Sequence, residues 1–348
     1  METKAPNLES LGLSEDNFCY YPFTQLLFQP TGVISPCCWN QDIVLGVVPN
    51  ETLEDIWNGE KARGLRREFL SGNPVSCKTQ MQHIRCHAWS RRNYEREMSF
   101  TELQPRGPQR LDVRLNGKCN LQCVMCEVWK QPNGLYDQSD FWTRGPAEIF
   151  PFLREVDVLG GEPFVQQDTY RLIDEVSQIN PECTWAFVTN GHYKFNAAIQ
   201  SRLDKIKIRW IQVSLDSVVP ETYAKVRVNG ELSKTLKTVD DFIAYLGARP
   251  ADRKFHFNVS MCVHRLNWHE LDKSLAYARG KGVPVILQFA FQPESVSLLS
   301  LSQSDRREIL RFARSLEREY GADVLHPIVS PLQDSLEREP SPRAEAVP

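Results

Sequence analysis

The sequence predicts an α/β protein in which a parallel sheet follows a small α+β domain. Strand-like and helix-like segments alternate from residue 111 onward, which is typical of βαβ units. A stretch with two prolines and a glycine precedes them and indicates a linker. Five of the ten cysteines lie before residue 90, in a segment with its own hairpin and helix patterns. The expected parts are a tail at 1–16, the small domain at 17–98, the linker at 99–110, the α/β domain at 111–325 and a disordered tail at 326–348.

The composition narrows the class of protein. With 348 residues and 41% hydrophobic content, the chain can bury a sizeable core. A net charge of -3 gives no general attraction to nucleic acid. The chain has no apolar run long enough for a bilayer, and its polar, acidic start lacks the apolar centre of a signal peptide. We therefore expect a soluble cytoplasmic protein with no membrane or nucleic-acid partner.

The small domain should begin with a β-hairpin. The apolar runs 26–28 and 33–34 flank Pro30-Thr31-Gly32, where glycine allows a turn with positive φ. This hairpin would hold Cys19 and Cys37 at its open end. Thr52 can cap a following helix that ends at Gly59, and a second helix should end at Gly72.

The α/β domain should contain six βα units. The expected strands are Leu111–Leu115, Val156–Leu159, Thr184–Val188, Trp210–Leu215, Lys254–Val263 and Val283–Phe289. The expected helices are Thr169–Ile179, Asn196–Ile206, Val239–Leu246, His269–Arg279 and a last one at Ser304–Tyr320. In such a sheet, functional groups gather at the carboxyl ends of the strands.

Three cysteines follow the first of these strands with the spacing Cys-x3-Cys-x2-Cys, at Cys119, Cys123 and Cys126. Three thiolates this close can hold one iron–sulfur cube and leave one iron without a protein ligand. A structural zinc site, which normally has four ligands, is the alternative.

This spacing resembles the cluster motif of the radical S-adenosyl-L-methionine (SAM) enzymes, in which SAM chelates the fourth iron of a [4Fe–4S] cluster. Strand two ends in Gly160-Gly161-Glu162-Pro163, which resembles the GGEP motif of that family. The resemblance implies an open (β/α)6 barrel, a partial TIM-type fold. It also implies that the GGEP backbone and Glu162 accept hydrogen bonds from the SAM ammonium group. Ser214 and Asp216 resemble the ribose-contacting position, and Arg227 is similar to an arginine that often meets the SAM carboxylate. The residues expected at the SAM site are Gly160, Gly161, Glu162, Pro163, Asn190, Ser214, Asp216 and Arg227.

The N-terminal segment resembles the SPASM/twitch domain, which binds auxiliary clusters in the same superfamily and usually follows the barrel. It carries Cys-x2-Pro-Phe from Cys19, Gly-x4-Cys at Gly32 to Cys37, and Asp55-Ile-Trp-Asn. The resemblance implies an auxiliary [4Fe–4S] cluster on Cys19, Cys37, Cys77 and Cys86. Cys38 could replace Cys37, and a zinc-bound domain remains an alternative because zinc also takes four thiolates.

The implied activity is the reductive cleavage of SAM to a 5′-deoxyadenosyl radical, which abstracts a substrate hydrogen. A flavodoxin or ferredoxin-type protein would supply the electron. The auxiliary domain favours a peptide or protein side chain as substrate, with a sugar or nucleotide derivative as the alternative. On the strand at 254–263, Cys262 lies at the rim of a polar face and is a candidate hydrogen donor, or a small buried cysteine without a role. The hypothesis from another class is a non-catalytic iron–sulfur electron carrier or zinc scaffold.

Overall fold

The computed structural model describes residues 8, 12–13, 18–77 and 99–338. The chain divides into two compact units. The first comprises Met1–Lys118, Lys130–Phe187 and Ala197–Arg209, and the second comprises Cys119–Trp129, Val188–Asn196 and Trp210–Pro348.

The strands of the first unit follow the order β3-β2-β1-β4-β6-β7. Their bounds are β1 Gln25–Phe28, β2 Val33–Ser35, β3 Gly46–Val47, β4 Arg110–Val113, β6 Glu155–Val158 and β7 Thr184–Thr189, whose last two residues belong to the second unit. β1 and β2 form the expected antiparallel hairpin. β1 also pairs in parallel with β4, so the hairpin extends the parallel pairs β4–β6 and β6–β7.

One apolar row crosses these parallel strands. Leu26, Leu111, Val156 and Trp185 are consecutive partners in the register, and all four side chains are buried. Apolar side chains at every second position explain this row, because alternate residues of a strand share one face. The other face carries charges, which are described with the site.

The helices of the first unit include the two expected in the small domain. Thr52 caps the first of them, with a reciprocal hydrogen bond from its own backbone N–H to Asp55. The bounds are α1 Tyr21–Thr24, α2 Leu53–Asn58, α3 Glu60–Leu70, α5 Asp140–Thr143, α6 Gly145–Glu148, α7 Gln167–Ile179 and α8 Ala197–Leu203.

The second unit is built on three parallel strands. They are β8 Lys207–Ser214, whose first three residues belong to the first unit, β10 His256–Val263 and β11 Val285–Phe289, with β10 paired to both neighbours. A separate two-stranded antiparallel ladder joins β5 Gln122–Cys123 to β9 Arg227–Val228. The helices are α9 Pro220–Val226, α10 Leu232–Ala248, α11 Leu271–Lys281, α12 Gln303–Tyr320 and α13 Ala322–Arg338.

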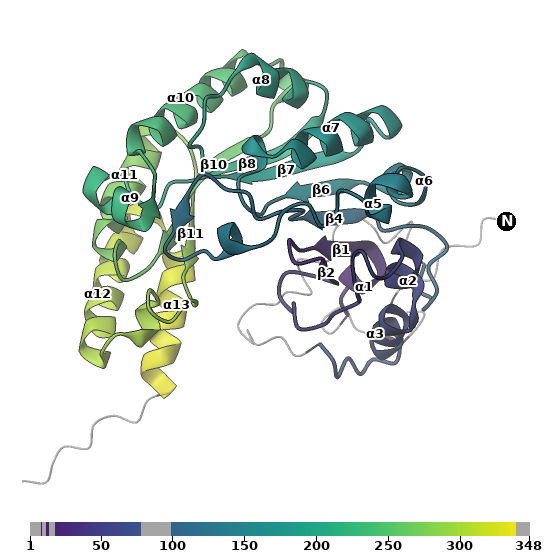
Figure 1. The fold of residues 1–348 in the computed structure, drawn as a ribbon. Helices are drawn as coiled ribbons and strands as arrows, with labels where there is room; N and C mark the ends of the chain where they lie inside the picture. Colours follow the sequence, from purple (N-terminus) through teal and green to yellow (C-terminus); the bar gives the residue numbers. More distant parts are fainter. Residues whose placement is uncertain (1–7, 9–11, 14–17, 78–98, 339–348) are drawn as a thin grey trace, which may run out of the picture. The chain divides into compact units, whose positions relative to one another are not determined.

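The structure corrects the expectation of a disordered C-terminal tail. Helix α13 covers Ala322–Arg338 in spite of two internal prolines. Its buried face carries Leu325, Ile328, Val329 and Leu332, which pack in one apolar cluster with residues of β10, β11 and α12. α12 and α13 lie side by side (Figure 1). Proline content suggested disorder, but an apolar stripe at helical spacing gives tertiary packing that outweighs the lost backbone bonds. Residues 339–348 lie outside the described part.

All six expected strands of the α/β domain are present as β4, β6, β7, β8, β10 and β11, and every pairing given above among them is parallel. The α/β fold class is therefore confirmed. The boundaries at 17–98 and 111–325 stay a prediction, and the first compact unit contains residues from both of those segments. Among the described residues, none of the helices combines the length and the apolar character needed to cross a bilayer.

Candidate functional site

The three-cysteine loop is fixed by the β5–β9 ladder of the second unit. Cys123 lies directly opposite Arg227 in this ladder, and the Val124 N–H donates to the Val226 carbonyl at 3.0 Å. The Cys126 N–H donates to the Cys123 carbonyl at 3.1 Å and closes a turn. The backbone therefore brings the second cysteine of the motif opposite the residue expected at the SAM carboxylate, and the third cysteine follows in a turn closed on the second.

The three thiols are free and partly buried. Cys119 Sγ accepts hydrogen bonds from the Leu121 N–H at 3.4 Å and from Asn190 Nδ2 at 3.6 Å. Burial raises the pKa of the Cys123 thiol to about 12, against the lowering effect of Arg227, and Asp216, Cys126 and Cys119 raise it further. In the ranges that the structure describes, no three His, Cys, Asp or Glu side chains converge tightly enough to hold a single metal ion. The ligand role of the three cysteines stays a prediction.

A buried ion pair lies beside this loop. Arg227 Nη2 is 2.8 Å from Asp216 Oδ2, and Asp216 Oδ1 accepts a hydrogen bond from the Cys262 N–H at 2.7 Å. Burial lowers the pKa of Arg227, but the charges of Asp216 and Cys123 outweigh it and the net pKa is raised. Asp216 therefore connects the cysteine loop with the end of β10.

Asp216 stands in the left-handed region, with φ of 59°, which is uncommon for a residue with a side chain. Asn267 holds it there, because Asn267 Nδ2 donates to the Asp216 carbonyl at 2.8 Å and to the Cys262 carbonyl at 2.9 Å. Strained backbone of this kind is kept where the surroundings over-determine it, often at functional sites. The two hydrogen bonds of Asn267 thus link the segments at the carboxyl ends of β8 and β10.

The donor set fits the implied cofactors. Three thiols with mutual electrostatic influence lie in one unit with a buried guanidinium. Among the described residues, the buried Nε of Arg227 has no hydrogen-bond acceptor. An anionic group bound beside the thiols, such as the carboxylate of SAM, would supply one.

The glycine motif of the first unit forms a close backbone approach. Gly160 and Gly161 have positive φ of 78° and 52°. A Cβ on Gly161 would lie 2.2 Å from the Lys118 carbonyl oxygen, and one on Gly160 would lie 2.6 Å from Arg114 Cβ. The Glu162 N–H donates to the same Lys118 carbonyl at 2.9 Å. The motif therefore packs against the residue that immediately precedes Cys119, which only residues without a side chain allow.

The other expected SAM residues are also placed. Glu162 is fully buried and its Oε1 accepts from the Phe164 N–H, and Pro163 begins a short 3-10 turn. Asn190 Nδ2 donates to Asn120 Oδ1 at 2.9 Å. Ser214 ends β8 opposite Ser260.

The structure groups the predicted residues by unit. Those of the second unit are Cys119, Cys123, Cys126, Asn190, Ser214, Asp216, Arg227 and Cys262, and those of the first are Gly160 to Pro163, Cys19, Cys37 and Cys77. All these SAM assignments stay predictions.

The auxiliary cysteines are only partly described. Cys19 and Cys37 are buried, and burial raises the pKa of Cys37 to about 12, with smaller raising effects from Cys38 and Cys77. Cys38 is half-buried, and its pKa is raised to about 11 by burial. Cys86 lies outside the described residues.

The sequence did not predict two features of the site. The first is Asn267, whose side chain links Asp216 to Cys262, and nothing in its local sequence indicates this role. The second feature is a charged sheet face in the first unit, where Asp157 pairs with both Arg110 and Arg209. The period-two alternation Arg110-x-Asp112-x-Arg114 could have indicated this polar face.

Comparison with known proteins adds independent findings. A model described as the radical SAM superfamily matches residues 113–286, half of the chain, and a model described as an iron–sulfur cluster-binding domain (SPASM) matches residues 19–86. A GTP 3',8-cyclase of Nautilia profundicola is 25% identical over 186 residues, which cover 50% of this chain and 53% of that protein. A GTP 3',8-cyclase of Hydrogenovibrio crunogenus is 29% identical over 181 residues, covering 50% and 52%. The chain spans about half the length of these curated relatives. Among solved structures, SuiB of Streptococcus suis matches with a TM-score of 0.44 and 14% identity, over 62% of this chain and 48% of that one.

Proposed function

Because the chain belongs to the radical SAM superfamily, we propose that it is an enzyme that cleaves SAM reductively at a [4Fe–4S] cluster held by Cys119, Cys123 and Cys126. The observation that carries the proposal is the position of this loop. Cys123 stands opposite Arg227, a buried cation with a spare donor, in the same compact unit as the Asp216–Cys262 contact. Bound there, the cluster and SAM would supply sulfonium cleavage and abstraction of a substrate hydrogen atom.

The chain's own residues hold and orient the cofactor. Arg227 Nε offers a hydrogen bond to the SAM carboxylate, while its Nη2 remains paired with Asp216. From the resemblance to the GGEP motif, we propose that the backbone at Gly160 and Gly161 accepts hydrogen bonds from the SAM ammonium group. Both carboxylate oxygens of Asp216 already accept protein hydrogen bonds, so we propose that it orients Arg227 in addition to any ribose contact.

Cys262 is retained as a candidate hydrogen donor. Burial raises the pKa of its thiol to about 12, and the charges of nearby Asp216, Cys123 and Cys126 act in the same direction, against Arg227. The thiol therefore keeps its proton at neutral pH. An S–H group is the form that donates a hydrogen atom, whereas a thiolate is the form that acts as a nucleophile.

We propose that Cys19, Cys37, Cys77 and Cys86 hold the auxiliary cluster, with Cys38 as the alternative to Cys37. The match of residues 19–86 to an iron–sulfur cluster-binding domain supports this role. A cluster with four protein thiolates has no vacant iron, which favours electron transfer over substrate ligation. A flavodoxin or ferredoxin-type reductant in the cytoplasm would supply the electron.

For the substrate we favour a small molecule. The curated relatives are named for a reaction of GTP, which is a small molecule. These names favour a small-molecule substrate over a peptide or protein side chain, which was the other class that the sequence left open. An experiment on the substrate must therefore compare the two classes.

Replacing the three loop cysteines together tests the proposal. In anaerobically reconstituted protein with dithionite, Cys119→Ala/Cys123→Ala/Cys126→Ala should release no methionine or 5′-deoxyadenosine from SAM and should retain about one cluster's worth of iron. The matched control is Cys183→Ala, because Cys183 is a buried cysteine of the first unit outside both motifs. SAM cleavage by the triple variant at the wild-type rate would end the proposal.

A further inference from the structure

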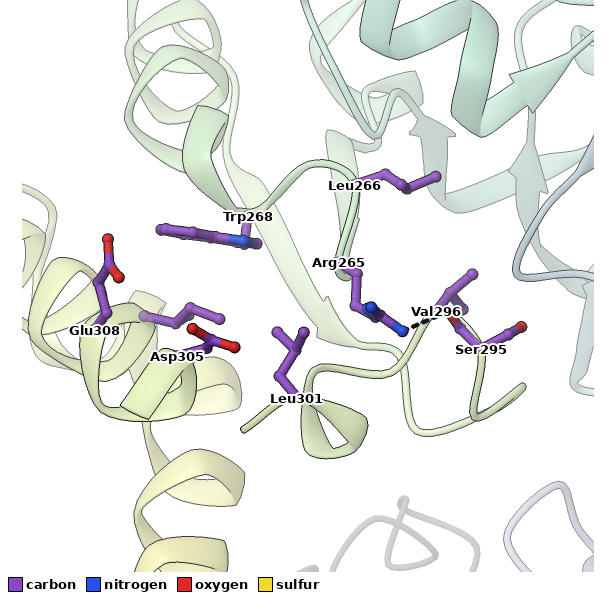
Figure 2. A pocket seen from close by; sticks show the side chains of 9 residues that line it. Arg265, Leu266, Trp268, Ser295, Val296, Leu301, Asp305 and Glu308 are labelled. Carbon is purple, nitrogen blue, oxygen red and sulfur yellow. Dashed lines mark hydrogen bonds between the residues drawn. The ribbon is translucent and has the colours of Figure 1, made fainter. Parts of the chain in front are cut away.

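A pocket of about 450 Å³ lies within the second unit, between loops at the carboxyl ends of two strands and the start of α12. Arg265 and Trp268 follow β10, Val296 and Leu301 come from the segment after β11, and Asp305 and Glu308 belong to α12 (Figure 2). This volume is in the range of small-molecule sites, about 300–1,000 Å³. The mouth of a parallel sheet at its carboxyl ends is also where ligands bind in α/β folds.

The lining separates opposite charges. In Figure 2, Trp268 and Asp305 lie on one side of Leu301, and Arg265 lies on the other. Throughout the part of the chain that the structure describes, neither Asp305 nor Glu308 has an ion-pair partner. Among the described residues, the Arg265 guanidinium makes one long hydrogen bond, from Nη1 to the neutral Ser295 carbonyl at 3.4 Å. Within the described ranges, the pocket thus offers two carboxylates and one guanidinium that form no ion pair with another side chain.

An aromatic ring and apolar side chains form the rest of the pocket lining. The Trp268 ring is partly buried, and Val296 and Ile309 are buried apolar side chains in its wall. An indole face attracts a cation, and nearby carboxylates strengthen that preference. The end with Trp268 and Asp305 therefore fits an amine or guanidinium group, and the end with Arg265 fits an acid group.

The pocket loop is tied to the proposed cofactor site. Asn267 lies between two lining residues, and its side chain bonds the carbonyls of Asp216 and Cys262. Glu270, three residues later, is buried and accepts hydrogen bonds from Ser217 Oγ at 2.6 Å and Thr222 Oγ1 at 2.7 Å. The loop that lines the pocket is therefore anchored to Asp216 through Asn267 and to the segment that follows Asp216 through Glu270.

We propose that this pocket binds the substrate, and that the substrate is a small zwitterion with its cationic group at Trp268, Asp305 and Glu308 and its acid group at Arg265. The proposal rests on the proposed function, because it assigns the substrate of that reaction. Two carboxylates against one guanidinium disfavour a polyanion, so the pocket selects against a nucleoside triphosphate.

The test uses L-lysine as the zwitterionic probe and GTP as the polyanionic one, each titrated by calorimetry into the reconstituted holoprotein with SAM. We expect L-lysine to bind and GTP not to compete with it. The double variant Asp305→Asn/Glu308→Gln should bind L-lysine about tenfold more weakly, and Arg265→Gln should weaken it similarly, because each change removes a charge-assisted contact. The matched controls Glu317→Gln and Arg318→Gln change α12 residues outside the pocket and should leave the affinity unchanged.

Thermal unfolding of each variant checks that the fold is kept, as expected because Arg265, Asp305 and Glu308 are exposed. The inference would be overturned if L-lysine did not bind. It would also be overturned if the double variant bound L-lysine as tightly as the wild type does, or if GTP bound more tightly than L-lysine. SAM cleavage measured in the same samples separates the two claims. Cleavage without L-lysine binding removes the pocket assignment alone, and loss of cleavage in the wild-type holoprotein removes the proposed function and the substrate assignment with it.

Discussion

Arg227 and Asp216 form a buried ion pair, with 2.8 Å between Nη2 and Oδ2 and side chains that are 6% and 2% exposed. Arg227 also stands opposite Cys123 in the β5–β9 ladder, and Asp216 receives the Cys262 N–H. The cysteine loop, the end of β8 and the end of β10 therefore meet at one charged pair. A substitution in this ion pair should therefore disturb the position of all three segments.

Asp216→Asn should destabilise the protein strongly. It removes the counter-charge and leaves the Arg227 guanidinium buried without compensation, which typically costs about 3–5 kcal/mol. The free energy of unfolding from urea titration measures the effect. Lys237→Gln is the control, because it breaks the exposed pair with Asp241 on α10 and should have little effect. Equal stability of both variants would show that the buried pair does not hold the site together.

Gly161→Ala should impair both folding and SAM binding. The left-handed backbone alone costs about 1–2 kcal/mol for a residue with a Cβ, and the added carbon would lie 2.2 Å from the Lys118 carbonyl oxygen. The backbone before Cys119 must then shift. Gly247→Ala is the matched control, because nothing lies within 4 Å of its Cβ position and it stands inside α10, where alanine is favoured. Wild-type SAM affinity in equilibrium dialysis of the Gly161→Ala variant would contradict the proposed role of the turn.

The sequence predicted the elements whose signals are local. The alternation of strand-like and helix-like segments predicted β4, β6 and β7, and the capping residue Thr52 predicted α2. The cysteine spacing and the glycine pair also predicted the two loops that the structure places in tight turns. Each of these depends on residues close together in the chain.

What the sequence could not predict depends on long-range contacts. The parallel pairing of β1 with β4 joins segments about 85 residues apart, and no periodicity in either strand specifies its partner. Asn267 has no local pattern, because its clamp is made to carbonyls of Asp216 and Cys262 on neighbouring strand ends. Helix α13 was missed because its two prolines are a local signal for a break, whereas its stability comes from packing against α12.

Cys262 should be an unreactive, protonated thiol in the folded protein. Because burial raises its pKa to about 12, iodoacetamide at pH 8 should leave Cys262 unmodified, and the same reagent in urea should modify it. Mass spectrometry of tryptic peptides measures both states. The Cys262→Ala variant should still cleave SAM, since a hydrogen donor acts after cleavage. Rapid alkylation of the folded protein, or loss of cleavage in the variant, would exclude the donor role.

His264 should make the stability of the protein depend on pH below about 6.5. Its side chain is fully buried, and Nδ1 accepts the Leu266 N–H, so the neutral ring carries its proton on Nε2. Burial lowers the pKa of His264, Asp216 acts to raise it, and Arg227 lowers it again. The unfolded chain therefore takes up a proton near pH 6.5 while the folded chain does not. Stability is full above that pH and falls as the pH drops toward the folded pKa, by about 1.4 kcal/mol for each pH unit in which only the unfolded chain is protonated.

Urea unfolding of the metal-free protein between pH 7.5 and 5.5 measures this dependence. His264→Gln should give a shallower fall in stability than the wild type, because its side chain cannot take up a proton. His326→Gln changes an exposed histidine on α13 and should keep the wild-type slope. His192 has a pKa that burial also lowers, so some slope should remain in His264→Gln. An unchanged slope in that variant would mean that the buried ring at the end of β10 is not the group that titrates.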